Sequence, residues 1–349
     1  MAQDKIVTGI ASFGMSGKVF HAPLLTNHEG FYLKTIVERK NNQAQQWYPD
    51  VQISKSFEDL LHDSEIELVI VNTPDHTHAE LAHKALMAGK HVIVEKPFTL
   101  HASECEDLLN LAIRKNKILS VFQNRRWDGD FLTVQKVIKN ELLGKLVEYE
   151  AHFDRFRNYI QPNTWKEDSS TGTGTLYNLG SHLIDQALVL FGMPFSVFAD
   201  IRTLRPEGKV DDFFEVLLNY PEIRVVLKAS YLVREPGPRY ALHGTHGSFL
   251  KYGIDPQEDA LKKGESPLNV DWGKESADMW GILNADKRGL HYVGKLETIP
   301  GNYMAFYDNI FEAIVNGKEL AVKPEEAINV ISVIEAAMES HKHKKIISL

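Results

Sequence analysis

The chain has 349 residues, of which 43% are hydrophobic and 25% charged, so it is long enough for two ordinary globular domains. The formal net charge of -8 argues against a nucleic-acid partner, because a phosphate binder needs a basic face. The single cysteine, Cys105, excludes an internal disulfide. With no signal-peptide pattern and no apolar stretch near the ~18 residues of a membrane span, we expect a cytoplasmic protein without a membrane partner.

The first third of the chain alternates short runs rich in Val and Ile with helical patterns. Such alternation predicts crossover units and a parallel sheet covered by helices on both faces. The predicted strands are 6–11, 33–37, 68–72, 91–95 and 119–122, and the predicted helices are 18–27, 42–48, 56–63, 78–88 and 102–115. Gly89 is placed to stop one helix, and Ser56 with Asp59 to begin another.

The pattern changes near residue 124, where we place a domain boundary (1–123 and 124–349). A helix at 131–139 and a long alternating segment at 147–157 come first. The runs 196–204, 212–220, 224–232, 240–244 and 248–252, joined by short turns, predict an open antiparallel sheet. Pro324 suits the first turn of a final helix over 325–343.

A glycine turn, Gly9-Ile-Ala11-Ser-Phe-Gly14, follows the first predicted strand and opens a helix. Glycine at such a turn lets the backbone approach a pyrophosphate at the helix N-terminus. The motif alone is weak, because turns between strand and helix often carry glycine, but its place after the first predicted strand favours a dinucleotide site. The expected cofactor contacts here are Gly9, Ala11, Phe13, Gly14, Met15 and Ser16, with Gly17 offering a further amide.

Glu38-Arg39-Lys40 ends the second predicted strand. A carboxylate at this position normally accepts from the adenosine ribose hydroxyls of NAD, whereas neighbouring cations pair with the 2′-phosphate of NADP. This sequence offers both, and a solvated charge cluster is the plain alternative. We favour NADP, because two cations can reach the phosphate.

Two polar segments follow the next predicted strands. Asn72, Thr73, Pro74, His76 and His78 lie at the carboxyl edge of the sheet, where ligands bind, so we expect cofactor contacts there and no metal site. Glu95-Lys96-Pro97 then places a charged pair directly after a buried strand, at a desolvation cost. Lys96 could donate to a substrate hydroxyl. Pro97 permits a cis bond. A surface salt bridge is the alternative.

Asn178, His182 and Asp185 are spaced to share one face of a helix. That face could present an amide and an imidazole to a polyol, with Asp185 orienting the ring; a helix capped by Asn178 is the plain alternative. Asn124, Arg126 and Trp127 follow the last predicted strand of the sheet and could contact the cofactor, or serve only as a hinge. A polar and aromatic mixture suited to carbohydrate, or to a subunit interface, comprises Arg155, Arg157, Tyr159, Asn163 and Trp165.

Together these motifs resemble the glucose–fructose oxidoreductase / inositol dehydrogenase (Gfo/Idh/MocA) family along essentially the whole chain. The segments 120–128, 176–182 and 251–259 resemble a narrower branch that includes NADP-dependent scyllo-inositol dehydrogenases. The resemblance implies an α/β fold: a doubly wound Rossmann domain, then an α/β domain with a large, mostly antiparallel open sheet. In the family the open sheet face commonly forms homodimers or homotetramers.

The resemblance also implies the chemistry. Lys96 and His182 would form the proton-transfer pair, with Asn178 beside them at the substrate. From the polar and aromatic segment we add Arg155 and Trp165 as expected substrate contacts. The family usually has aspartate at position 178, and an amide cannot carry a charge beside His182. We expect hydride transfer between NADP (or NAD) and a secondary alcohol or ketone of a cyclic polyol or sugar, such as scyllo-inositol. The alternatives are a non-catalytic cofactor-binding regulator and an aldose dehydrogenase or aldose–ketose oxidoreductase.

Overall fold

The computed structural model describes residues 5–40, 42–162, 164–168, 172–287 and 289–349. The chain forms two compact units, each assembled from separate stretches of sequence. Unit 1 comprises Met1–Trp127, Gln257–Trp272 and Asn302–Ile328, and unit 2 comprises Asp128–Pro256, Gly273–Gly301 and Asn329–Leu349. The boundary expected after residue 123 stays a prediction; the compact units differ from it in giving unit 1 two later segments.

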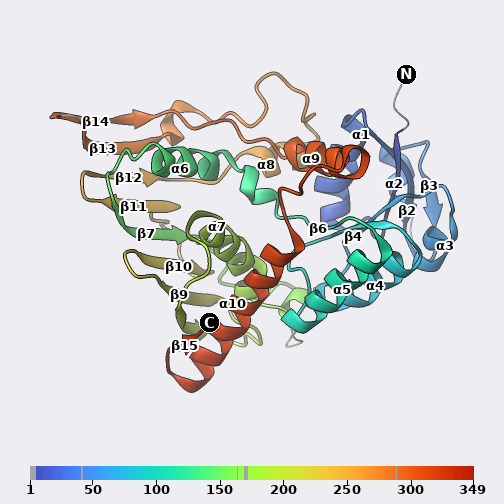
Figure 1. The fold of residues 1–349 in the computed structure, drawn as a ribbon, viewed down its shortest axis with the longest axis horizontal. Coiled ribbons are helices and arrows are strands. Elements are labelled where there is room, and N and C mark those ends of the chain that lie inside the picture. Colours follow the sequence, from blue (N-terminus) through green and yellow to red (C-terminus); the bar gives the residue numbers. More distant parts are fainter. Residues whose placement is uncertain (1–4, 41, 163, 169–171, 288) are drawn as a thin grey trace. The chain divides into compact units, whose positions relative to one another are not determined.

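Unit 1 is built on a six-stranded sheet in the order β3-β2-β1-β4-β5-β6 (Figure 1). All neighbouring strands are parallel, which confirms the doubly wound sheet. The order reverses between β1 and β4, and ligands bind beside such a switch point. The strands are β1 (Ile6–Ile10), β2 (Phe31–Val37), β3 (Gln52–Ser54), β4 (Leu68–Val71), β5 (His91–Val94) and β6 (Leu119–Val121).

The helices of unit 1 follow local signals in the sequence. Ser56 caps its helix by accepting from the N–H of Asp59 at 3.0 Å, and Gly89 ends another with a φ of +75°. The helices are α1 (Ala22–Asn27), α2 (Ala44–Trp47), α3 (Phe57–His62), α4 (His78–Met87), α5 (Ala102–Lys115), α8 (Gln257–Lys262) and α9 (Met304–Asn316). A π-helical turn, η1 (Gly17–His21), leads into α1, and two short 3₁₀ turns are η2 (Asp75–Thr77) and η3 (Asn124–Trp127).

Unit 2 contains a nine-stranded sheet in the order β14-β13-β12-β11-β7-β10-β9-β8-β15 (Figure 1). Among the strands that the structure describes here, β7 and β10 pair in parallel and all other neighbours pair antiparallel, which confirms a large, mostly antiparallel sheet. The strands are β7 (Leu146–His152), β8 (Ser196–Arg202), β9 (Phe213–Asn219), β10 (Arg224–Ser230), β11 (Tyr240–Gly244), β12 (Gly247–Lys251), β13 (Gly281–Lys287), β14 (Leu290–Leu296) and β15 (Ile347–Ser348).

Strand register separates the two faces of this sheet. One face is buried, and its directly paired residues are Val197, Leu218, Val225, Tyr149, Leu242, Phe249 and Leu283. We call the opposite face the outer face; its paired row is Phe198, Leu217, Val226, Glu150, Ala241, Leu250 and Ile282. Phe198 and Ile282 on it are each 40% exposed.

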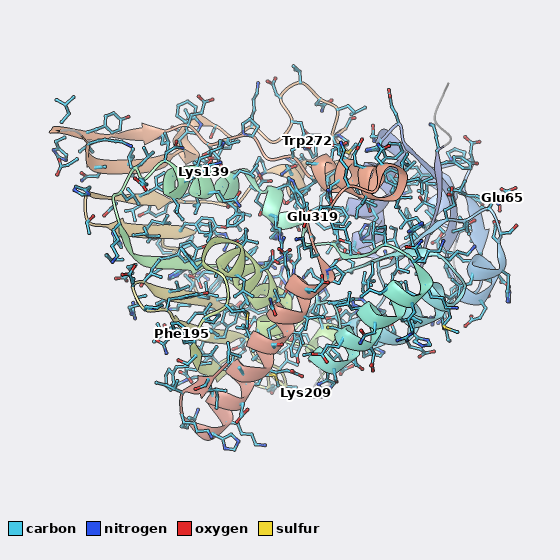
Figure 2. The ribbon with its side chains drawn as sticks, in the orientation of Figure 1. Glu65, Lys139, Phe195, Lys209, Trp272 and Glu319 are labelled. Carbon is cyan, nitrogen blue, oxygen red and sulfur yellow. The ribbon has the colours of Figure 1, made fainter. Side chains whose placement is uncertain are left out.

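In the described residues of unit 2 the α-helices are α6 (Gly129–Lys139), α7 (Ser181–Phe191) and most of α10 (Pro324–His343). Pro324 is the first residue of α10, as predicted. The shorter turns are η4 (Trp165–Glu167), η5 (Leu176–Gly180) and η6 (Ala277–Met279). Figure 2 adds the side chains, among them Phe195 just before β8, which is 67% exposed. No helix in the described part of the chain is long and apolar enough to cross a membrane.

Candidate active site

The carboxyl edge of the unit 1 sheet gathers the predicted cofactor segments, because every strand of a parallel sheet ends on the same side. Residues 11–16 follow β1, 38–40 follow β2, 72–78 follow β4, 95–97 follow β5 and 124–127 follow β6. The fold therefore brings together five segments that span more than a hundred positions of sequence.

The loop after β1 is closed by a polar side chain from β4. Asn72 donates from Nδ2 to the carbonyl oxygen of Ser12 at 2.8 Å, and Ser16 Oγ lies 3.4 Å away. A Cβ on Gly17 would lie 2.2 Å from the Ser12 oxygen and 2.9 Å from Asn72 Nδ2, so no larger residue fits there. A Cβ on Gly14 would meet only Ser12 Oγ, at 3.4 Å. The loop can therefore pack closely on its helix because residue 17 is glycine, at a position outside the glycine motif of residues 9–14.

An open pocket of about 280 Å³ lies at this edge. It is lined by Ala11, Ser12, Phe13, Val37, Glu38, Arg39, Lys40, Thr73 and Pro74. Beside it, Asn72 is 6% exposed, and its Oδ1 atom has no hydrogen-bond partner among the described residues. The open pocket and the unused buried acceptor both fit a bound dinucleotide.

Glu38 is engaged by the main chain. Its two carboxylate oxygens accept from the N–H groups of Gln43 (3.2 Å) and Ala44 (2.8 Å), at the start of α2. The residue is only 9% exposed, whereas Arg39 and Lys40 are exposed beside the same pocket. The carboxylate therefore stabilises a helix N-terminus, and the two cations are the more exposed charged groups that line the pocket.

His78 is fully buried between two loops of the edge. Its Nδ1 lies 2.9 Å from the carbonyl oxygen of Pro97, and its Nε2 lies 2.9 Å from that of Thr73. The ring thus connects the loop after β4 to the loop after β5. His76, two residues earlier, is exposed. Among the described residues no cluster of three or more His, Cys, Asp or Glu could hold a metal ion.

Glu95, Lys96 and Pro97 follow β5, and the Lys96–Pro97 bond is cis. Lys96 is half-buried, and its N–H donates to Glu95 Oε2 at 3.0 Å. Burial alone would raise the pKa of Glu95, but a hydrogen bond from His21 and the positive charges nearby outweigh it, so this pKa lies below its usual range. A buried, ionised carboxylate therefore stands directly beside the candidate lysine.

The segment after β6 is held within unit 1 by later parts of the chain. Arg126 donates to Glu326 at 2.7 Å and to the carbonyl of Ala321 at 2.8 Å. The Trp127 ring packs edge-on against Phe306, with 5.8 Å between ring centroids. Asn124 is 4% exposed. These contacts anchor the segment in unit 1. Its contact with a cofactor stays a prediction.

In unit 2, a π-helical turn, η5, runs directly into α7, so Asn178 lies inside the helical segment and does not cap it. The start is instead held by Asp211, whose Oδ2 accepts from Thr175 Oγ1 and from the N–H of Leu176, each at 2.8 Å. Burial raises the pKa of Asp211, although these bonds oppose the shift. His182 (4% exposed) and Asp185 (2%) follow in the first turns of α7.

The predicted carbohydrate segment is fixed by a buried arginine that the sequence reading did not single out. Arg205 pairs with Asp212 at 2.9 Å and with Glu167 at 2.9 Å. Through Glu167 it holds the turn that carries Trp165, which is half-buried. Arg155 lies 5.1 Å from the Phe153 ring centre. Asn163, in the same segment, lies outside the described residues.

Four other residues that the sequence reading overlooked, or used differently, organise these sites. Gly17 was expected only to supply an amide. His21, Tyr307 and Asp211 carried no signal, since their partners are 35 to 286 positions away.

Comparison with known proteins extends this picture to both units. Residues 6–123 match the family model described as "Oxidoreductase family, NAD-binding Rossmann fold". Residues 135–349 match the model described as "Oxidoreductase family, C-terminal alpha/beta domain". The two matches together span most of the chain.

Individual relatives match along almost the full length. A scyllo-inositol 2-dehydrogenase (NADP⁺) of Bacillus subtilis is 42% identical, covering 99% of this chain and 96% of the relative. The oxidoreductase YdgJ of Escherichia coli is 40% identical over 99% of both chains. A crystal structure of a Bacteroides fragilis protein superposes with a TM-score of 0.92 at 50% identity, covering 99% of this chain and 100% of that one. The chain therefore belongs to the Gfo/Idh/MocA oxidoreductase family and is an NAD(P)-dependent dehydrogenase.

Proposed function

We propose that this enzyme uses NADP to oxidise a secondary alcohol of a cyclic polyol, an inositol such as scyllo-inositol, and to reduce the corresponding ketone. The observation that carries the proposal is the position of Lys96 at the carboxyl end of β5, on the sheet edge that also holds the dinucleotide pocket. The substrate class is supported by the 42% identity to the Bacillus subtilis enzyme named for scyllo-inositol.

The proposed mechanism gives Lys96 and His182 the proton. When bound, the nicotinamide supplies the hydride chemistry. Lys96 or His182 accepts the hydroxyl proton as the alcohol is oxidised, and returns it to the oxygen when the ketone is reduced. A positive charge on Lys96 beside the developing alkoxide lowers the barrier further. Asn178, Arg155 and Trp165 are proposed to orient the ring of the polyol.

The preference for NADP is supported by the position of Glu38. An acidic side chain that selects NAD must offer its oxygens to the ribose hydroxyls. Here both oxygens already accept main-chain N–H groups of residues 43 and 44. The exposed Arg39 and Lys40 remain available for a 2′-phosphate. The other residues proposed to contact the cofactor are Gly9, Ala11, Phe13, Gly14, Met15, Ser16, Asn72, Thr73, Pro74, Glu95, Asn124, Arg126 and Trp127, with His76 and His78 through their loop.

The decisive experiment follows reduced-nicotinamide absorbance with purified enzyme, NADP and NAD in turn, and a panel of inositols and aldoses. We expect reduction of NADP with an inositol. Turnover of aldoses alone would replace the proposed substrate by an aldose. Cofactor binding by calorimetry without turnover of any panel member would favour the non-catalytic regulator.

The cofactor preference is tested by replacing Arg39 and Lys40 together with alanine. We expect the Kd for NADP to rise about 10- to 100-fold while the Kd for NAD changes little, because only NADP loses a paired phosphate. Arg114 and Lys115, an exposed pair in α5, provide a charge-matched control when replaced in the same way. Equal losses for NADP and NAD would contradict the assignment.

We also propose that the enzyme is a homodimer or homotetramer formed through the outer face. Its paired row is apolar except for Glu150; Phe198 and Ile282 in it are each 40% exposed, and exposed apolar side chains gathered on one face mark interaction surfaces. Phe198→Glu should shift the molecular mass measured by light scattering to that of a smaller assembly. Ile113→Glu, at a 67% exposed position of α5, is the control. An unchanged mass in the Phe198 variant would reject this face.

A further inference from the structure

A buried chain of three polar side chains lies behind the candidate lysine in unit 1. His21 Nε2 lies 3.0 Å from Glu95 Oε1, and His21 Nδ1 lies 2.7 Å from the hydroxyl oxygen of Tyr307. The side chain of His21 is fully buried, that of Glu95 is 8% exposed, and Tyr307 is fully buried. Three elements meet here: the π-helical turn η1, the end of β5 and α9.

The Glu95 end of this chain has one possible direction. The carboxylate of Glu95 can only accept, so Nε2 of His21 carries a hydrogen and donates it to Glu95 Oε1. Burial and the nearby charge of Glu95 raise the pKa of Tyr307 well above its ordinary value, so its hydroxyl stays protonated and shares a hydrogen bond with Nδ1 of His21.

The chain connects two parts of the site. His21 lies in the helix that begins after the glycine loop, where Gly17 packs against Ser12 and Asn72. The second oxygen of Glu95 accepts the main-chain N–H of Lys96 at 3.0 Å. One imidazole therefore ties the helix of the dinucleotide loop to the main chain of the candidate lysine.

The loop after β5, which carries Lys96, is also held by His78 through the carbonyl of Pro97. The charged and titratable groups acting on Glu95 are His21, Lys96 and His78. Burying a carboxylate without donors is costly, so removal of the His21 N–H would leave Glu95 to rotate or to take up a proton. Rotation would release the main chain of Lys96, and protonation would weaken its bond to Glu95 by removing the negative charge.

We propose that His21, held by Tyr307, is a positioning residue for Lys96: it fixes the Glu95 carboxylate, which fixes the backbone of the lysine relative to the dinucleotide loop. The role of Lys96 in this proposal rests on the proposed function. His21 itself touches neither substrate nor cofactor in this scheme.

The test compares two amides at position 21. In His21→Gln the longer side chain can place its N–H₂ near the position of Nε2 and so still donate to Glu95, whereas His21→Asn reaches only toward Tyr307. We expect kcat to fall about 10- to 100-fold in His21→Asn and less than about threefold in His21→Gln, with the KM for NADP nearly unchanged in both. Equal kcat values for the two variants, high or low, would overturn the proposal.

A second readout does not depend on turnover, so it separates this proposal from the proposed function. Wild type and Tyr307→Phe are treated with a limiting amine-acylating reagent, and acylation of Lys96 is quantified by mass spectrometry against the exposed Lys263. We expect the Lys96 to Lys263 ratio to change about threefold or more when the hydroxyl is lost, because the lysine environment relaxes. An unchanged ratio in the folded variant would overturn the positioning role, even if no polyol is a substrate.

Discussion

The two compact units position their candidate residues in different ways. At the carboxyl edge of unit 1, the segments follow successive strand ends of one sheet, and the critical constraint is the missing side chain of Gly17. In unit 2, the helix that carries His182 is started by a carboxylate from another segment, Asp211. The Trp165 turn is likewise held from a distance, by Arg205.

Both regions share one device, a π-helical turn directly before an α-helix: η1 precedes α1, and η5 precedes α7. Such turns are frequent at functional sites. In unit 1 the turn ends at His21, which reaches Glu95. In unit 2 it contains Asn178. The difference teaches that the glycine loop of unit 1 is specified mainly by local main-chain geometry, whereas the candidate substrate segments of unit 2 depend on buried charges distant in sequence.

The largest effect is expected when the proposed proton-transfer residue of either unit is replaced, which tests the two units separately. Lys96→Met and His182→Asn should each lower kcat about 10²- to 10⁴-fold while NADP still binds, because general acid–base groups contribute in that range. Stopped-flow and calorimetric measurements provide kcat and Kd. Lys263→Met, at an exposed position, is the control for Lys96. Near-normal kcat in either variant would remove that residue from the mechanism.

A second prediction tests the local, main-chain character of unit 1 with two glycines of one loop. Gly17→Ala should destabilise the protein by about 3 kcal/mol, because its Cβ has no room. Gly14→Ala should leave thermal stability of the cofactor-free enzyme nearly unchanged, since only Ser12 Oγ lies near. If Gly14 approaches the pyrophosphate, that variant should instead bind NADP more weakly. Differential scanning calorimetry and titration separate the two effects, and equal melting temperatures would contradict the packing argument.

Much of the fold follows from pattern. Short β-branched runs separated by helices predicted five of the six parallel strands. The missed strand, β3, has a single apolar residue, Ile53, and so shows no apolar run, whereas β6 of equal length has two. In unit 2 the five later strand runs were found. The β13–β14 hairpin was missed: almost all of β14 is exposed, so it lacks the alternation that marks a half-buried strand.

The candidate site was predictable where the chemistry is local. The glycine turn, the cations after β2 and the lysine after β5 can each be read from a few neighbouring residues. Glu38 could not be assigned, because its partners at 43 and 44 depend on how the chain folds back into α2. For His21 and Tyr307 the obstacle is greater, since 286 positions separate two atoms that lie 2.7 Å apart.

The smallest expected effects concern two ion pairs: Arg125–Glu258, largely buried in unit 1, and Arg224–Glu148, exposed in unit 2. Burial would raise the pKa of Glu258, but the charge of Arg125 and the bond from Lys262 lower it to about 2. Because the folded pKa is depressed, the pair stabilises the protein above the ordinary glutamate pKa and loses that effect as the pH falls toward 2.

Arg125→Met should therefore cost about 1–2 kcal/mol near neutral pH and progressively less in acid, as measured by urea unfolding at successive pH values. Arg224→Met removes the exposed pair with Glu148 and should change stability by less than about 0.5 kcal/mol at any pH. A pH-independent loss in Arg125→Met would mean that packing of the arginine stem, rather than its charge on Glu258, holds the later segment of unit 1 in place. In that case the charge of the buried Arg125–Glu258 pair would contribute no more to stability than the charge of the exposed Arg224–Glu148 pair in unit 2.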